Sequence, residues 1–320
     1  MPATTTTIRE PAATSIALIE RSGAASLREI GAGHFLETLA GPGVVVLRGF
    51  HTELEEFEAF TRSLCTCFHR VAARDKLRDA RGDGFTAKAP ERNFTLLAHS
   101  EGTYRPFKEP DLAFFYCLVP PESPGGEALA VDGRLFLERL PPSIRSRIET
   151  QDVVFEAYWE PERWQAEFGI DNPSEFAAIA KQYPGLACEF DGEYMRYRCR
   201  HSAIQPDAQG WSVFSNAILA HLPAVRHDKY RDARVYTKES NRVYFGDGEA
   251  LPIRVVNTLI DIQDQVAHAH RLQRHDLLVL DNSRVMHGRR PMKRDGPRVL
   301  LTRFGHLREE LRWGGRPVAA

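Results

Sequence analysis

The chain has 320 residues, of which 42% are hydrophobic and 27% are charged, and its formal net charge is −1. This ordinary globular composition gives no electrostatic case for binding nucleic acid or an anionic membrane surface. No apolar run approaches the roughly 18 residues of a spanning helix, and the N-terminus lacks the charged start and apolar core of a signal peptide. We therefore expect a globular protein that acts on small molecules.

Cysteine usage indicates the compartment. The chain has five cysteines at scattered positions, namely Cys65, Cys67, Cys117, Cys188 and Cys199. An odd number without regular spacing argues against a disulfide framework and predicts a reducing, cytoplasmic location. The Cys65–Cys67 pair is compatible with a thiolate metal site. We interpret these two residues as packed cysteines instead, because no second pair stands nearby.

The first third of the chain begins with a Thr-rich segment, and we expect residues 1–15 to form a loose tail. Gly41–Phe50 is a β-branched run between turn residues and predicts a buried strand. Thr52–Leu64 carries apolar residues at helical spacing, with Thr52 in the N-cap position. Residues 74–92 are polar and contain glycines. They predict a loop that is either an active-site lid or a plain surface connection.

The middle of the chain begins with two predicted strands, Leu112–Val119 and Glu127–Val131, separated by a Pro- and Gly-rich turn. Asp132 stands in the N-cap position of a helix that follows. Residues 141–187 then predict a mostly helical insertion within a single domain that spans residues 16–320. An Asp-Gly step at residue 191 indicates a β-hairpin.

The last third contains a strand at Asn241–Phe245 and an amphipathic helix over Pro252–Ala269. Three strand-like segments then follow in close succession, namely Asp276–Leu280, Ser283–His287 and Arg298–Phe304. Strands at both ends of the chain, without regular alternation of strand and helix, exclude a parallel α/β sheet. The sequence predicts a mainly β protein built on an antiparallel barrel or sandwich around a central cavity.

Three side chains form a candidate metal site. His99 and Glu101 lie two residues apart just before a predicted strand, so in an extended chain they point to the same side. His287 offers a second imidazole from the other end of the chain. Two imidazoles and one carboxylate leave three cis positions of an octahedral metal open, which is the ligand set of non-haem Fe(II) oxygenases. The His-x-Glu pattern alone is common, so this hypothesis depends on its context.

That context is an ordered series of motifs. They are His99-Ser-Glu101-Gly-Thr-Tyr, Pro110-Asp-Leu-Ala-Phe-Phe-Tyr-Cys, Pro120-Pro with Gly125-Gly-Glu-Ala-Leu-Ala-Val-Asp, Gly246-Asp-Gly, and Asp281-Asn with His287-Gly-Arg and Pro297-Arg-Val-Leu. From about residue 43 to residue 306, the series resembles the taurine dioxygenase (TauD/TfdA) superfamily of Fe(II)- and 2-oxoglutarate-dependent oxygenases. The nearer branch includes clavaminate synthase and amino-acid hydroxylases, which have Glu in the carboxylate position.

The resemblance implies a double-stranded β-helix, or jelly-roll, core flanked by helices. It also implies iron held by His99, Glu101 and His287, with 2-oxoglutarate and O2 as cosubstrates. An arginine past the distal histidine is expected to bind the far carboxylate of 2-oxoglutarate, because its planar fork pairs a carboxylate with two hydrogen bonds. Arg298 is our choice. Arg303 remains an alternative for the cosubstrate or for an anionic substrate, and regular alternation places the two arginines on opposite faces of a strand.

Family positions also suggest substrate contacts. These candidates are Ser100, Thr103, Asn216 and Arg303. The chain departs from the family pattern at one position that concerns the cosubstrate. The family often has a Thr there that touches 2-oxoglutarate, and this chain has Ala128. Basic residues alternate between residues 194 and 200, which indicates either a solvated strand face or a contact for the carboxylate or phosphate of a carrier-linked substrate.

The expected reaction is hydroxylation of an unactivated C–H bond, with desaturation or ring formation as variants of the same chemistry. By analogy, the substrate is a small amino acid, free or tethered to a carrier protein, in natural-product biosynthesis. Two other classes remain open at this point. One is a non-catalytic barrel that binds a small acid, and the other is a Zn-dependent hydrolase that uses the same three ligands.

Overall fold

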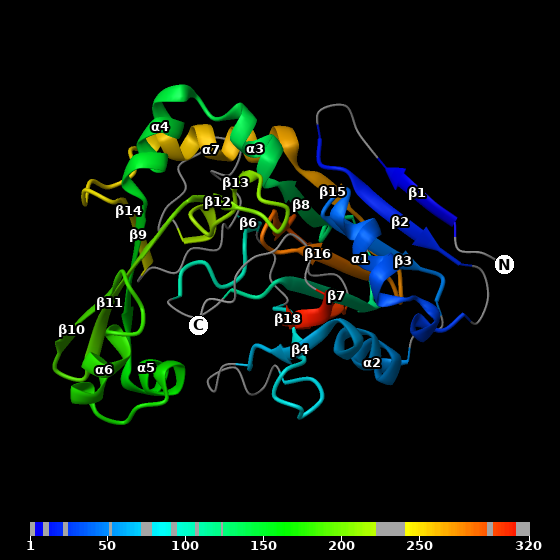
Figure 1. The fold of residues 1–320 in the computed structure, drawn as a ribbon, viewed down its shortest axis with the longest axis horizontal. Helices are drawn as coiled ribbons and strands as arrows, with labels where there is room; N and C mark the ends of the chain where they lie inside the picture. Colours follow the sequence, from blue (N-terminus) through cyan, green and yellow to red (C-terminus); the bar gives the residue numbers. More distant parts are fainter. Residues whose placement is uncertain are drawn as a thin grey trace.

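The computed structural model describes residues 4–8, 13–21, 25–50, 53–71, 79–90, 95–105, 109–122, 124–221, 241–292 and 297–311. Strands predominate, and helices cover their outer faces (Figure 1). The predicted N-cap residue Thr52 and parts of the predicted loop 74–92 lie outside the described residues.

The largest sheet has the strand order β1-β2-β3-β16-β7-β18-β4, with β5 also paired to β18. Its pairs are antiparallel except for β2 and β3, which run parallel. Its strands are β1 (Thr4–Ile8), β2 (Ile16–Glu20), β3 (Val44–Arg48), β4 (Cys65–Phe68), β5 (Ala87–Lys88), β7 (Leu112–Val119), β16 (Leu277–Asp281) and β18 (Val299–Leu307).

A second, four-stranded sheet lies against the first. Its strands are, in order, β15 (His268–His270), β8 (Ala128–Asp132), β17 (Val285–Arg289) and β6 (Leu96–His99). Alternate strand residues from both sheets, such as Val46 and Leu280 from one and Ala130 and Val285 from the other, share one buried cluster. Two facing antiparallel sheets with an apolar interior form the predicted jelly-roll core, and the predicted fold class is confirmed.

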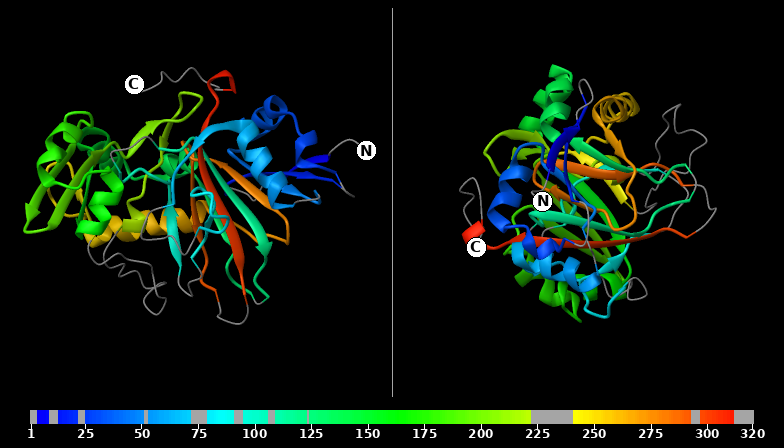
Figure 2. Two further views of the ribbon diagram at one scale, coloured as in Figure 1. Left: turned by 90° about the horizontal axis from the view of Figure 1, so that it is seen from below. Right: turned by 90° about the vertical axis from the view of Figure 1, so that its right-hand side faces the viewer.

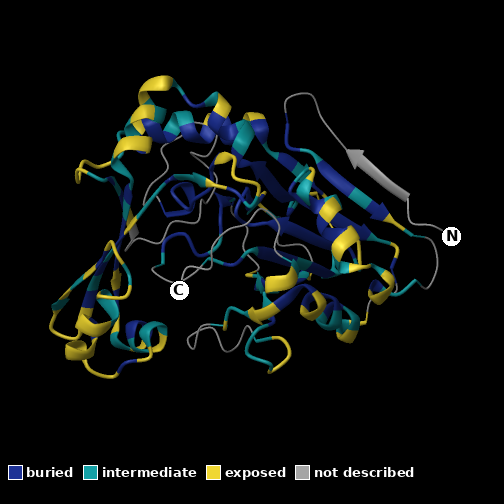
Figure 3. Cartoon of the chain, viewed as in Figure 1, coloured by how far each residue is buried: buried dark blue, intermediate teal, exposed yellow. Residues whose placement is uncertain are grey.

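Helices cover the two outer faces. The helices α1 (Ala32–Ala40) and α2 (Leu54–Leu64) bury Phe35, Phe57 and Phe60 against the large sheet. On the other side, α3 (Gly133–Arg139) and α7 (Ile253–Val266) cover the second sheet, and the predicted helix in the C-terminal third is thus confirmed. The strands of both sheets are largely buried, whereas the helices expose their outer sides (Figure 3).

Residues 153–201 and the strand β14 form a separate layer, which we call the cap. Its antiparallel strands are, in order, β10 (Leu186–Asp191), β11 (Tyr194–His201), β9 (Val153–Trp159) and β14 (Asn241–Phe245). Two helices, α5 (Pro161–Phe168) and α6 (Phe176–Ala180), pack on it, and α4 (Pro142–Gln151) precedes it. The cap has its own apolar cluster, which includes Trp159 and Trp164. It lies at the opposite end of the molecule from α1 (Figure 2).

The insertion predicted at 141–187 contains the helices α4, α5 and α6, and the strand β9, which was not predicted, also runs through it. The strand period is present in the sequence, because Val153, Phe155, Ala157 and Trp159 alternate and are all buried. The predicted hairpin at Asp191 is confirmed, since β10 and β11 pair on either side of that turn.

Part of the segment predicted as a loose tail, residues 1–15, forms a strand, and residues 1–3 and 9–12 of it lie outside the described residues. Thr4–Ile8 pairs with Ile16–Glu20 in an antiparallel ladder. The Thr14 hydroxyl is fully buried, donates to the Val266 carbonyl at 2.7 Å and accepts the Asp132 N–H at 2.8 Å. Threonine is β-branched and suits a strand, so the Thr-rich run favours pairing over a free tail.

The remaining short elements are β12 (Ile204–Pro206), β13 (Ser212–Phe214) and the 3-10 helices Leu27–Glu29, Pro173–Glu175, Leu219–His221 and Glu309–Leu311. Asp132 caps α3 as predicted, because its side chain accepts the N–H of Arg134. All five cysteines are free. Among the helices that the structure describes, none combines the length and apolar content that crossing a membrane requires.

Candidate metal centre and its cavity

Antiparallel pairing of β6 with β17 places His287 directly opposite His99. The two imidazole rings lie 4.3 Å apart between centroids, and Glu101 Oε2 lies 3.9 Å from His99 Nε2. One potential ligand atom from each of the three side chains lies within 4.8 Å of the other two. No other group of this kind occurs among the described residues. The structure therefore brings together the three residues that the sequence singled out.

The protonation states of the two imidazoles suit them to bind a metal. His99 Nδ1 lies 3.1 Å from the Leu97 carbonyl, which can only accept, so this nitrogen carries the proton and Nε2 keeps its lone pair. Burial, with a smaller contribution from the neighbouring His99, holds the pKa of His287 well below its usual range. The Nδ1 atom of His287 is buried without a hydrogen-bond partner among the described residues. Two neutral imidazoles and a carboxylate fit a divalent cation such as Fe(II).

The backbone of Glu101 is held by Asn282. The Asn282 side chain accepts the Glu101 N–H at 2.8 Å and donates to the carbonyls of Glu101 and Pro110, each at 3.0 Å. Gly102 follows with a φ of +88°, and a Cβ there would lie 3.2 Å from the Pro110 ring. Asn282 leads into the strand that carries His287, so one amide ties together the two segments that supply the ligands.

The three side chains open onto a cavity of about 660 Å³. Its barrel end is lined by residues of the two sheets, including Phe115, Ala128, Leu278, Arg298 and Leu300. Its cap end is lined by Tyr104, Arg105, Tyr158, Glu160, Arg163 and His221. A cavity of this size has room for a small dicarboxylate and a second small molecule.

Arg298 lies where the cosubstrate hypothesis needs it. It is buried, with 5% of its surface exposed, and it lines the cavity together with Leu300, Thr302 and Phe304. These residues alternate along β18, so one face of the strand forms a wall of the cavity. Ala128, which stands where the family often has a Thr, also lines the cavity together with these residues.

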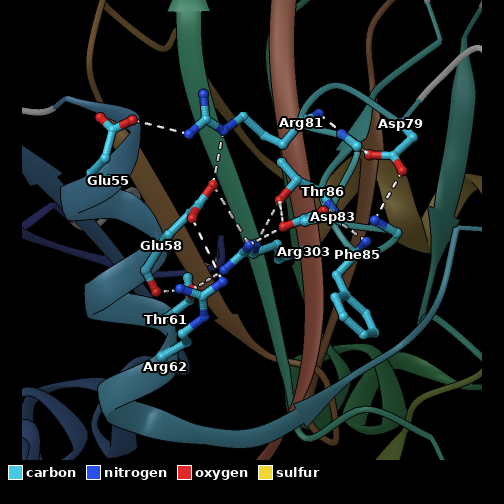
Figure 4. Close-up of polar contacts among 12 residues, drawn as sticks. Glu55, Glu58, Thr61, Arg62, Asp79, Arg81, Asp83, Phe85, Thr86 and Arg303 are labelled. Carbon is cyan, nitrogen blue, oxygen red and sulfur yellow. Dashed lines mark hydrogen bonds and ion pairs between the residues drawn. The ribbon is translucent and has the colours of Figure 1, made fainter.

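Arg303 points the other way, into the packing between β18 and α2 (Figure 4). Its guanidinium donates to the hydroxyls of Thr86 and Thr61 at 2.8 and 2.9 Å and forms an ion pair with Asp83. It is 1% exposed and does not line the cavity. This placement corrects the alternative in which Arg303 binds 2-oxoglutarate or substrate, because its hydrogen-bonding edge is already occupied by protein.

Three other predicted substrate contacts also lie outside the cavity lining. Ser100 and Ser215 share a hydrogen bond of 2.5 Å between their hydroxyls, and the Thr103 hydroxyl donates to the Ser100 carbonyl at 3.3 Å. The Asn216 amide donates to the Ala203 carbonyl and accepts the Ile218 N–H, both at 3.0 Å. Ser100, Thr103 and Asn216 are buried and bond to other parts of the chain, so their placement does not support the substrate role predicted for them.

The cap supplies cavity residues that the sequence analysis did not find, among them Arg163 and Tyr158. Arg289 is also buried, lines the cavity and donates to the Pro90 carbonyl at 2.6 Å. By contrast, two of the alternating arginines of β11 are paired with carboxylates of the cap. Arg196 and Arg198 both donate to Glu156, at 2.8 and 2.7 Å, and Arg196 also pairs with Glu189, so two carboxylates offset the two cations.

A jelly roll with two histidines and a glutamate converging on an internal cavity defines the class of non-haem iron oxygenases. The family model described as "Taurine catabolism dioxygenase TauD, TfdA family" matches residues 13–304. The chain therefore belongs to the TauD, TfdA family of dioxygenases. The predicted enzyme class, a dioxygenase that uses iron, 2-oxoglutarate and O2, is confirmed at the level of the family.

Individual relatives agree with this assignment. A clavaminate synthase-like protein of Arabidopsis thaliana is 25% identical over 295 residues, which cover 84% of this chain and 83% of that protein. The fold is similar to that of PvcB from Pseudomonas aeruginosa, with a TM-score of 0.61, 14% identity and coverage of 98% and 95% of the two chains. It is also similar to AAD-2 solved with Mn(II) and N-oxalylglycine, with a TM-score of 0.53, 14% identity and coverage of 99% and 100%.

Proposed function

We propose that His99, Glu101 and His287 bind one Fe(II) ion and that the enzyme hydroxylates an unactivated C–H bond of a small substrate. The observation that carries this proposal is the convergence of three ligand atoms within 4.8 Å of one another, at the wall of an internal cavity. Bound iron would activate O2 while 2-oxoglutarate is oxidised to succinate and CO2 and one oxygen atom enters the substrate.

The chain's own residues prepare this chemistry. The Leu97 carbonyl fixes the tautomer of His99, and Asn282 fixes the backbone of Glu101. The rings of Phe115 and Phe304 lie 4.9 and 6.2 Å from the ring of His287, between centroids, so this side of the site is apolar. An apolar wall lowers the local dielectric constant and strengthens the charge interactions beside it. Because Glu101 supplies the carboxylate ligand, no ligand position is left vacant for chloride, and hydroxylation is favoured over halogenation.

We assign Arg298 to the far carboxylate of 2-oxoglutarate. It is buried in the cavity wall, and a guanidinium can pair a carboxylate with two parallel hydrogen bonds. The Arg303 side chain on the opposite face of β18 is held by Asp83, Thr86 and Thr61, which leaves Arg298 as the better candidate on this strand.

For the substrate, we propose a small amino-acid-like or carrier-linked compound of natural-product biosynthesis. Two relatives support this class, namely the clavaminate synthase-like protein and PvcB, which is described as an oxygenase from an isonitrile synthetic pathway. Desaturation or ring closure remains the variant of the same chemistry. We also propose the cytosol as the compartment, because the five cysteines are free.

The test uses metal-free protein reconstituted without oxygen with Fe(II), Mn(II) or Zn(II). Calorimetry measures 2-oxoglutarate binding, and succinate formation is then followed after O2 is admitted. We expect one 2-oxoglutarate per chain with Fe(II) or Mn(II), and succinate only with Fe(II). Binding of 2-oxoglutarate without succinate would indicate a non-catalytic acid-binding barrel, and full hydrolytic activity with Zn(II) alone would indicate a hydrolase.

A further inference from the structure

Resting on the proposed function, we propose that Arg105 and Arg163 form an anion-binding subsite at the cap end of the cavity, so that the substrate carries a carboxylate, sulfonate or phosphate group. Neither residue was found by the sequence analysis. Both line the cavity, one from the loop after Glu101 and the other from α5 of the cap.

The first argument is the charge of the cavity wall. Among the described residues, five guanidinium groups line the cavity against two carboxylates, which are Arg70, Arg105, Arg163, Arg289 and Arg298 against Glu101 and Glu160. A bound Fe(II) ion and the two carboxylates of 2-oxoglutarate carry opposite charges of equal size. Loading the site therefore leaves this balance unchanged. Arg70 is exposed and Arg105 is paired with Glu167, and the positive excess that remains in the wall favours an anionic ligand.

The second argument is how Arg105 is held. Its Nη1 lies 3.0 Å from Glu167 Oε1, and its guanidinium lies 5.1 Å from the centre of the Tyr104 ring. Its buried Nε–H has no acceptor among the described residues. A guanidinium has five N–H donors, and Glu167 takes up only part of that edge. Burial on its own would lower the pKa of Arg105, but Tyr104 and Glu167 raise it, so the group stays charged.

The third argument is the placement of Arg163. Its guanidinium lies 4.4 Å from the centre of the Trp159 ring, and Trp159 is 1% exposed within the cap's own core. Stacking on a fixed indole orients the flat cation. Arg163, Arg105 and Tyr104 all line the cavity, and the Arg105 guanidinium lies 5.1 Å from the centre of the Tyr104 ring.

The subsite is separate from the site assigned to the cosubstrate. His287 contacts Phe115 and Phe304 on the barrel side of the centre, where Arg298 also lies. Arg105 comes from the loop after Glu101 and Arg163 from α5 of the cap, whereas Arg298 comes from the segment that leads into β18, so the two sets of arginines belong to different parts of the cavity wall. One acid would be held by Arg298 and the other by Arg105 and Arg163, so the remainder of the substrate would lie beside the metal between them.

The test needs neither iron nor turnover. Protein saturated with Mn(II) and 2-oxoglutarate is titrated with three acids that share a benzyl body, namely phenylacetate, phenylmethanesulfonate and benzyl phosphate, and with neutral phenylacetamide. Calorimetry gives Kd, and tryptophan emission reports on the site because Trp159 lies under Arg163. We expect at least one acid to bind saturably and about tenfold or more tightly than the amide. The tightest acid identifies the head group.

The variants Arg163→Gln and Arg105→Gln should each weaken binding of that acid about tenfold. Arg254→Gln is the matched control, because Arg254 is exposed on α7 and does not line the cavity. Arg298→Gln should weaken 2-oxoglutarate but not the probe at saturating 2-oxoglutarate. If Arg105→Gln does not fold, Arg163→Gln carries the test.

Three results would overturn the subsite: no saturable binding of any acid, equal binding of acid and amide, or acid binding that survives Arg163→Gln. These outcomes are distinguishable from failure of the proposed function, which would appear as absent 2-oxoglutarate binding in the first calorimetric step.

Discussion

The two faces of β18 carry arginines five residues apart that have unrelated surroundings. On the cavity face, Arg298 is followed by Leu300, Thr302 and Phe304, and all four line the space beside the three candidate ligands. On the packed face, Val299, Leu301 and Leu307 join the core under α2, and Arg303 is enclosed by hydrogen-bonding partners. The two arginines are close in sequence, but their odd spacing of five residues places them on opposite faces of the strand.

This difference assigns different tasks to the two faces. Changes on the cavity side should alter ligand binding and turnover with little effect on the free energy of unfolding. Changes on the packed side should lower stability first. The packed face also supports the cavity indirectly. Arg303 and Arg81 connect the segment that contains Phe85 to α2 (Figure 4), and Phe85 lines the cavity.

The largest effect is expected for His99→Ala. Loss of one of three ligands should lower 2-oxoglutarate consumption by about 10³-fold or more, while the thermal midpoint stays close to that of the wild type. His34→Ala is the control, since His34 is exposed on α1. If His99→Ala retained turnover, this would contradict the assignment of His99 as a metal ligand.

Next in size is Arg303→Met on the packed face. Removing the cation leaves Asp83 without its partner, and breaking a buried pair in this way costs about 3 kcal/mol. Urea unfolding should show this loss, whereas the affinity of the folded protein for 2-oxoglutarate should change little. A large loss of 2-oxoglutarate affinity at unchanged stability would reverse the roles assigned to the two faces.

Arg298→Gln is the matching change on the cavity face. A charge-assisted pair contributes about 1.5 to 3 kcal/mol, so the Kd for 2-oxoglutarate should rise by roughly 10- to 100-fold. Calorimetry with the Mn(II)-loaded protein measures this, with Arg254→Gln as the control. An unchanged Kd would mean that another group holds the far carboxylate.

The ion pair on the packed face also predicts a response to acid. Burial on its own would raise the pKa of Asp83, but hydrogen bonds from the N–H groups of Phe85 and Thr86 and from Arg303 lower it from 3.8 to about 2. A lowered pKa stabilises the fold above pH 3.8, and this contribution is lost as the pH falls toward 2. After allowance for partial exposure, it amounts to about 1 to 2 kcal/mol.

Unfolding measured between pH 5 and pH 2 tests this contribution. Relative to the wild type, Asp83→Asn should be less stable at pH 5, and the difference should shrink as the pH approaches 2. A constant difference across this range would show that the Asp83 carboxylate is not the group that titrates.

The smallest effect is expected for Ala128→Thr, which restores the hydroxyl that the family often places beside the cosubstrate. One added neutral hydrogen bond is worth about 1 kcal/mol, so 2-oxoglutarate should bind about fivefold more tightly. Ala128→Val has the same shape without the hydroxyl and serves as the control. Equal gains in both variants would assign the effect to packing.

The parts of the structure that could be predicted are those set by short-range periodicity. The alternation of Arg298 and Arg303 follows from the strand period, and the apolar spacing of α7 follows from the helix period. His99 ends β6 and Glu101 lies in the turn that follows, and the hydroxyl of Ser100 between them bonds Ser215. The substrate role predicted for Ser100 followed family position, which does not show this side-chain contact.

The parts that could not be predicted depend on how distant layers dock. Arg163 lies in a short helix, and nothing in its neighbourhood shows that the cap meets the jelly roll at that helix. The strand β9 was hidden among helical segments, although Val153, Phe155 and Trp159 alternate. The sequence analysis proposed that His99 and His287 meet, but it did not predict the pairing of β6 with β17 that brings them together, since the segments are far apart in the chain and carry no pairing signal of their own.

The central claim is that His99, Glu101 and His287 hold one metal ion, with 2-oxoglutarate on the cavity face of β18. A crystal structure of the protein with Mn(II) and 2-oxoglutarate tests it most directly. We predict one ion bound by these three side chains and a far carboxylate paired with Arg298. An ion bound elsewhere, or a carboxylate at Arg303, would contradict it.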